Sequence, residues 1–196
     1  MDGLSGFLLA ALALAGSPGP ATLSLTATGA AFGAGRGMAY LAGIVVGMVL
    51  VMAAVAAGLV GLLMAVPGAT PAVTVLAGAY FLYLAWRIAT APPLSDDNVR
   101  RPAPTFIAGL ALSLVNPKGY AAMAALYSGF VLVPGRVGTD IAAKMAVLTL
   151  VIVAVNVAWL LAGAGLTRFF RDPRSNRLIN VAFAVLLVAS VALAFA

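Results

Sequence analysis

Long apolar stretches alternate with short polar ones along the whole chain. Crossing a hydrocarbon layer about 30 Å thick takes about 20 helical residues. Six stretches reach or approach that length, at 4–28, 39–66, 72–89, 105–132, 141–166 and 178–195. They do not alternate in polarity as the roughly 10-residue strands of a membrane barrel do. The pattern therefore predicts an all-α polytopic membrane protein with six transmembrane helices, in a single domain over residues 1–196.

The composition agrees with a membrane protein and excludes several other classes. Hydrophobic residues make up 64% of the 196 residues and charged residues 8%, whereas soluble domains have about 45–50% and about 25%. The chain has no Cys and no His, which excludes thiolate metal sites and the usual proton shuttle. Its 11 Lys and Arg residues are scattered between apolar blocks and make no continuous phosphate-binding face. We therefore expect no enzyme, no catalytic residue, no metal, no cofactor and no nucleic-acid partner.

The basic residues are unevenly divided between the two predicted membrane faces. One side has Arg136 and Lys144. The other side has eight arginines, namely Arg36, Arg87, Arg100, Arg101, Arg168, Arg171, Arg174 and Arg177. The more basic side is normally cytoplasmic, so six spans place both termini outside. The longest polar stretch, about 92–104, is then an exposed linker on the cytoplasmic side.

The two halves of the chain are related by a shift of 99 residues. The shift aligns Phe7 with Phe106, Ser17 with Asn116, Pro18 with Pro117, and the short loop around Arg36 with the one around Arg136. Each half, about 1–91 and about 105–196, then holds three spans. Because three is odd, the second half starts on the opposite side of the membrane. Such inverted repeats are a recurrent transporter plan, with the binding site near the midplane.

The first span of each half is interrupted near its middle. Prolines and glycines follow one another in Gly16-Ser17-Pro18-Gly19-Pro20, and Pro117 follows Asn116 in the second half. Proline removes an N–H donor and clashes with the preceding turn, so we expect the first and fourth helices to be broken, with Asn116 capping the new helix. Each new helix start presents free N–H groups and a positive dipole end, which suits an anion. The alternative is a simple proline kink that serves packing.

Lys118, next to the second interruption, is the most informative residue. It lies 13 residues into its span, about 20 Å from that end. A central lysine costs about 2.5–3.5 kcal/mol to insert, and no carboxylate is expected inside the membrane to neutralise it. Lys118 can contact a substrate carboxylate or change protonation during a transport cycle. Alternatively, it is a structural lysine bonded to backbone carbonyls that the interruptions release.

Other residues inside the spans are weaker candidates. Asn156 lies in the middle of the fifth span, and Tyr120 shares a helix face with Asn116. Such polar groups more often make hydrogen bonds between helices. Gly43 and Gly47 form a small-xxx-small pair, which predicts close helix packing, either within the chain or between two copies in a homodimer.

Three motifs together resemble the lysine exporter and homoserine-threonine resistance (LysE/RhtB) family of bacterial amino-acid exporters. They are Ser17-Pro18-Gly19-Pro20, the stretch 78–87 that ends the third span with Trp86 and Arg87, and Asn116-Pro117-Lys118. The resemblance implies efflux of amino acids or derivatives through the cytoplasmic (inner) membrane by exchange with protons. Its motif positions carry onto Pro18, Gly19, Pro20, Asn116, Pro117 and Lys118. Ala21 departs from the pattern, since many members have Asn or Asp there.

We therefore expect a secondary exporter of amino acids or small zwitterionic derivatives, working by alternating access. Acceptors for the substrate amine would be freed carbonyls near 15–17 and Val115, with Asn116 or Asn156. The expected substrate-binding residues are Ser17, Pro18, Gly19, Pro20, Asn116, Pro117, Lys118, Tyr120 and Asn156. One alternative is a transporter of another small organic anion or polar metabolite, which needs no amine acceptors. Another is a membrane scaffold or assembly subunit without solute flux.

Overall fold

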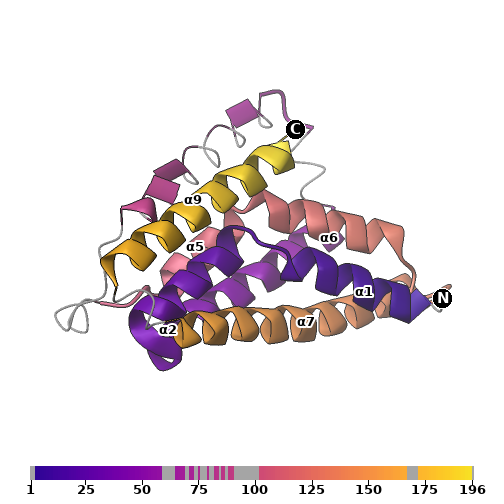
Figure 1. Cartoon of the computed structure of the whole chain (residues 1–196). Helices are drawn as coiled ribbons and strands as arrows, with labels where there is room; N and C mark the ends of the chain where they lie inside the picture. Colours follow the sequence, from indigo (N-terminus) through magenta and orange to yellow (C-terminus); the bar gives the residue numbers. More distant parts are fainter. Residues whose placement is uncertain are drawn as a thin grey trace.

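The computed structural model describes residues 3–58, 65–68, 102–166 and 172–195, with scattered positions between 71 and 90. Every regular element in the described part of the chain is α-helical. The helices are α1 (Gly3–Gly16), α2 (Pro20–Ala56), α5 (Phe106–Leu114), α6 (Pro117–Gly129), α7 (Val137–Gly165) and α9 (Pro173–Phe195) (Figure 1). The predicted all-α class is confirmed for these residues.

Two of the described helices, α2 and α7, are long and apolar enough to cross a membrane, and α1 is a shorter apolar helix. The predicted spans at 105–132, 141–166 and 178–195 overlap α5 with α6, α7 and α9. The second predicted span ends earlier than expected, because α2 stops at Ala56. Most of the third span and of the linker at 92–104 lies outside the described residues.

The connection predicted around Arg36 is present as a kink at Gly33, three residues earlier, rather than as a loop. The range of α2 joins two helical segments across this kink, where Gly33 has φ 78° and ψ 162°. The segments fold back on each other, because the Tyr40 hydroxyl donates to Ser24 Oγ at 3.0 Å, whereas residues 16 apart in a straight helix lie about 24 Å apart. A positive φ costs glycine little because it has no Cβ. One glycine therefore bends the chain where the sequence pattern suggests a loop. The corresponding segment around Arg136 is a true connection between α6 and α7.

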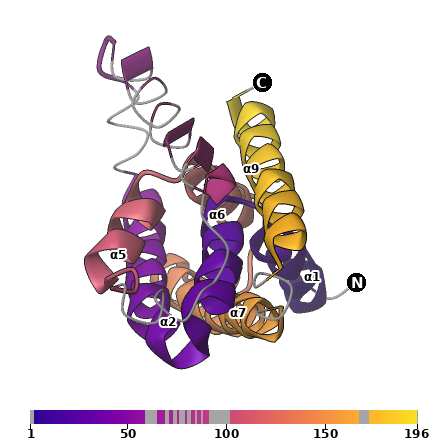
Figure 2. The same cartoon turned by 60° about the vertical axis from the view of Figure 1, so that its left-hand side comes forward.

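Helix α2 lies between α5 and α7 and packs against both (Figure 2). Glycines allow these close crossings. A Cβ on Gly43 would meet the backbone of α5, and a Cβ on Gly109 of α5 would meet the backbone of α2. Gly29 of α2 and Gly163 of α7 make a second such pair. The close packing predicted for Gly43 and Gly47 is confirmed, and it occurs within the chain.

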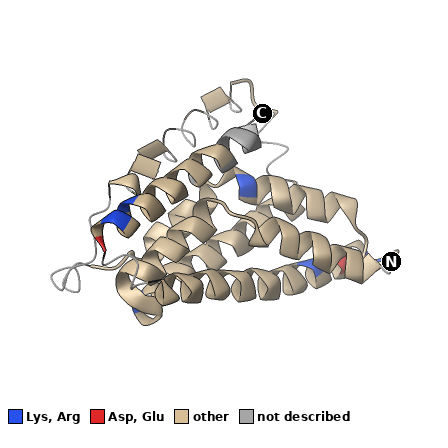
Figure 3. Ribbon diagram, in the orientation of Figure 1, with Lys and Arg blue, Asp and Glu red and all other residues tan. Residues whose placement is uncertain are grey.

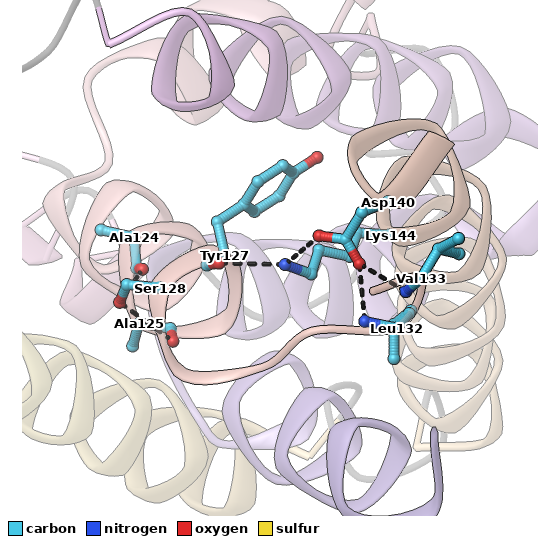
Figure 4. Close-up of polar contacts among 8 residues, drawn as sticks. All are labelled: Ala124, Ala125, Tyr127, Ser128, Leu132, Val133, Asp140 and Lys144. Atoms are coloured by element: carbon cyan, nitrogen blue, oxygen red, sulfur yellow. Dashed lines mark hydrogen bonds and ion pairs between the residues drawn. The ribbon is translucent and has the colours of Figure 1, made fainter. Parts of the chain in front are cut away.

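The described charged residues gather toward the two ends of the helix bundle, apart from the basic position at the start of α6, which lies between these ends (Figure 3). Lys144 and Asp140 belong to the first turns of α7, and both are buried. Their charged atoms are 2.7 Å apart. The Asp140 carboxylate also accepts the N–H groups of Leu132 and Val133, and Lys144 donates to the Tyr127 carbonyl (Figure 4). The pair therefore ties the end of α6 and the following loop to α7, a role that the count of basic residues does not reveal.

Replacing Gly43 with alanine tests the close crossing of α2 and α5. The new Cβ would overlap the backbone oxygen of Phe106, so the helices must move apart. Overpacking of this kind costs about 1–3 kcal/mol. We expect Gly43→Ala to lower the melting temperature of the detergent-solubilised protein. Gly35→Ala is the matched control, since a Cβ there meets open space, and equal melting temperatures for both variants would contradict the packing.

Candidate functional site

The chain between α1 and α2 is not helical. Helix α1 ends at Gly16 and α2 begins at Pro20, with Gly19 extended between them. Proline suits the first position of a helix because its missing N–H would have no helical partner. Thr22 stabilises this start: its hydroxyl accepts the Gly19 N–H at 2.9 Å and donates to the Gly19 carbonyl at 3.1 Å.

Several carbonyl groups at and after the end of α1 accept hydrogen bonds from side chains. Ser17 Oγ donates to Leu14 O at 3.0 Å, and the Trp159 indole of α7 donates to Gly16 O at 3.3 Å. Lys118 Nζ of α6 lies 2.6 Å from Ser17 O and 3.1 Å from Pro18 O. These contacts match the second alternative stated for Lys118, in which it is a structural lysine bonded to carbonyls that the interruptions release.

A second non-helical junction separates α5 from α6. Helix α5 ends at Leu114 and α6 begins at Pro117, with Asn116 at the N-cap position. The expected capping bond is not formed: the Asn116 side chain makes no hydrogen bond to the backbone at the start of α6. The Tyr120 hydroxyl donates instead to Leu114 O at 2.9 Å, across the junction. Tyr120 therefore stabilises the end of α5.

A cavity of about 60 Å³ lies where the two junctions meet. A buried water needs about 10–15 Å³ of such space, so the cavity has room for a few small groups. Helices α1, α2, α6 and α7 contribute its walls. Its lining residues are Leu14, Ala15, Gly19, Pro20, Ala21, Thr22, Ile44, Met48, Asn116, Lys118, Gly119, Ala122, Met123, Ile152 and Asn156.

The cavity brings together five of the nine residues expected to bind substrate. These are Gly19, Pro20, Asn116, Lys118 and Asn156, which come from both halves of the chain. The other four, Ser17, Pro18, Pro117 and Tyr120, are not among its lining residues. Ser17 and Pro18 are connected to the cavity through their carbonyl groups, which accept hydrogen bonds from Lys118.

Two amide oxygens in the cavity wall are free to accept hydrogen bonds. Asn116 and Asn156 are 5% and 6% exposed, and their Oδ1 atoms have no partner among the described residues. The Asn156 amide is oriented by its nitrogen, which donates to Ile152 O at 2.8 Å. Buried acceptors normally have a partner, since leaving one without costs about 1–3 kcal/mol. Both oxygens are thus prepared to receive a donor.

The electrostatics of the cavity suit a small zwitterion, a molecule with one positively and one negatively charged group. The starts of α2 and α6 are positive dipole ends and the end of α1 is a negative one. The Lys118 ammonium adds a positive charge, while the amide oxygens of Asn116 and Asn156 offer acceptors to a cation. Among the described lining residues there is no carboxylate, so this wall offers no ligand set for a hard metal ion.

Trp159 and Thr22 were missed as members of this region, although the sequence contains a signal for each. Trp159 follows Asn156 by three residues in an apolar span, and a buried indole N–H usually needs an acceptor. Thr22 follows Gly19 by three residues, the spacing at which a side chain bonds back to the N-cap backbone. Both stabilise the junction between α1 and α2.

Long apolar helices, non-helical junctions and a polar cavity between them are features that helical membrane transporters share. The chain matches the LysE type translocator family over residues 12–196, and it belongs to this family. Over 185 residues it is 31% identical to the cysteine/O-acetylserine efflux proteins of Escherichia coli (strain K12), Shigella sonnei (strain Ss046) and Shigella flexneri. The matched region covers 94% of this chain and 93% of each relative. No solved structure matches the chain.

Replacing Trp159 with phenylalanine tests how the end of α1 is held. The change keeps an aromatic ring but leaves Gly16 O without its indole donor. An unsatisfied buried group costs about 1–3 kcal/mol. We expect a lower melting temperature for Trp159→Phe in detergent. Trp86→Phe provides the control, since Trp86 is 60% exposed, and an equal loss in both variants would contradict the assigned role.

Proposed function

We propose that the protein is a secondary transporter that exports small zwitterionic amino acids or their derivatives across the bacterial cytoplasmic membrane. The observation that carries this proposal is the pairing in one cavity of a lysine ammonium with two unpaired amide oxygens. A carboxylate suits Lys118 and the starts of α2 and α6, and an ammonium group suits the oxygens of Asn116 and Asn156. The relatives, which are cysteine/O-acetylserine efflux proteins, support the same substrate class.

The cavity wall also limits the side chain of the substrate. Most of its remaining lining is aliphatic or thioether, from Leu14, Ile44, Met48, Met123 and Ile152. A charged side chain would find no opposite carboxylate in this described lining and would lose its hydration. A small uncharged side chain fits both the volume of about 60 Å³ and the apolar wall. This favours small neutral amino acids over basic or acidic ones.

The transport cycle we propose is alternating access between two inverted three-helix units, in exchange for protons. The element order supports this, because α1 and α5 each end near a junction that is followed by a proline-started helix. Both junctions contribute to one cavity, as inverted-repeat transporters place their sites. In this proposal the junctions interrupt the first and fourth of six membrane spans, and both termini lie in the periplasm.

A second candidate function is transport of a small organic anion or polar metabolite. The Lys118 ammonium and the helix starts would serve it equally well. However, it would leave Asn116 Oδ1 and Asn156 Oδ1 without partners. The unpaired oxygens therefore favour the amino-acid substrate.

Efflux from proteoliposomes separates the two functions. Vesicles containing the purified protein are loaded with radiolabelled serine, O-acetylserine or propionate, and the initial efflux rates are measured. Asn156→Leu removes one acceptor for the ammonium group, and a hydrogen bond to a charged group contributes about 1.5–3 kcal/mol. We expect its KM for the amino acids to rise about tenfold or more, with export of both amino acids by the wild type.

Thr149→Val is the matched control on the same helix, because its hydroxyl bonds to Met145 O and does not line the cavity. Its KM should stay at the wild-type value. Export of propionate but neither amino acid by the wild type, unchanged in Asn156→Leu, would establish the organic-anion function instead. No flux of any of the three solutes would contradict both functions.

A further inference from the structure

The ammonium group of Lys118 already occupies a binding site for a primary ammonium ion. Its nitrogen lies 2.6 Å from Ser17 O and 3.1 Å from Pro18 O. Both carbonyls follow the end of α1, where the partial charge of the helix dipole is negative. Carbonyls at the end of a broken helix are a recurrent way to bind cations inside membrane transporters.

We propose that the carbonyls of Ser17 and Pro18 are the subsite for the substrate's α-ammonium group, and that Lys118 fills this subsite as an internal ligand until the substrate displaces it. This inference rests on the proposed export of amino acids. It assigns the ammonium group to two backbone atoms and gives Lys118 a different partner in the empty and the loaded protein. Asn116 Oδ1 and Asn156 Oδ1 then complete the set of acceptors around the substrate.

Only a zwitterion leaves every charged group with a partner after this exchange. When the substrate ammonium takes the carbonyls, the Lys118 ammonium loses two acceptors and needs an anion. The substrate's own carboxylate supplies that anion, since the described lining of the cavity contains no carboxylate. A plain amine would displace Lys118 without giving it a partner, and a plain carboxylate would leave the carbonyls unfilled.

The same exchange loosens a link between the two halves of the chain. Lys118 belongs to the first turn of α6, whereas its acceptors lie between α1 and α2, about 100 residues earlier. In the empty protein this contact ties the start of α6 to the junction of α1 and α2. Substrate binding removes the tie at the moment that the cavity is filled.

Glycine at position 19 gives the lysine its path to the carbonyls. A Cβ built on Gly19 would lie 2.9 Å from Lys118 Cδ and 3.0 Å from Lys118 Nζ. The backbone at Gly19 is extended, with φ −174°, which alanine also adopts. Gly19→Ala should therefore displace the end of the lysine and weaken its hydrogen bonds to the carbonyls, while the charge of Lys118 is kept.

The test measures the binding of ethylammonium, an amine without a carboxylate, to the purified protein in nanodiscs. Wild-type protein should bind it weakly, because Lys118 holds the subsite. Lys118→Met empties the subsite, and we expect ethylammonium to bind at least tenfold more tightly. Gly19→Ala should shift the affinity for ethylammonium in the same direction. The proposal can therefore still be tested if Lys118→Met does not fold.

Two control variants account for effects of charge and of added volume. Arg36→Met removes a positive charge far along α2 in the sequence, and Gly35→Ala adds a methyl group in open space. Both should bind ethylammonium as the wild type does. A gain in Lys118→Met or Gly19→Ala that is absent from both controls supports the subsite, and no gain in either variant overturns it.

Failure of the subsite and failure of the proposed function give different results. If the wild type exports serine but neither variant gains affinity for ethylammonium, the subsite is wrong and the export function stands. If a variant gains affinity but the wild type exports neither serine nor O-acetylserine, the ammonium site is right and the proposed function is wrong.

Discussion

Backbone groups removed from water must find hydrogen-bond partners within the protein, and this constraint organises the region around the two helix junctions. A chain that stops being helical releases carbonyl and N–H groups that lipid cannot satisfy. At the end of α1 the released carbonyls are bonded by Ser17, Trp159 and Lys118, and at the end of α5 one is bonded by Tyr120. Several side chains around the cavity therefore act, in part, as hydrogen-bond partners of backbone carbonyls.

The packing of the bundle explains why the cavity lies at these junctions. Where α2 crosses α5 and α7, pairs of glycines bring the backbones into contact, and no space remains between the helices. Where the helices stop and restart, the chain cannot pack in this way. The polar ends of α1, α2 and α6 then face one another around a small space that carries both kinds of dipole end.

Much of this region could be predicted from the sequence because proline and lysine are costly in apolar helices. Pro20 and Pro117 locate the helix starts, and Lys118 stands out as a charge far from a span end. The partner of Lys118 could not be deduced from the sequence, since backbone carbonyls and a substrate carboxylate are both suitable hydrogen-bond acceptors for an ammonium group. The structure shows that Lys118 Nζ contacts the carbonyls of Ser17 and Pro18. The break expected around Arg36 lies at Gly33 and is a kink instead of a loop, because a single positive φ at a glycine redirects the chain without any longer connection.

The proposed export depends on one property of the protein, the binding of an amino acid between the two helix junctions. An experimental structure of the protein with bound serine or O-acetylserine tests it most directly. We expect the ligand in the cavity between Asn116, Lys118 and Asn156. Its ammonium nitrogen should lie within hydrogen-bond distance of Ser17 O and Pro18 O, and its carboxylate should contact Lys118. A ligand bound elsewhere in the chain, with Lys118 still on those two carbonyls, would contradict it.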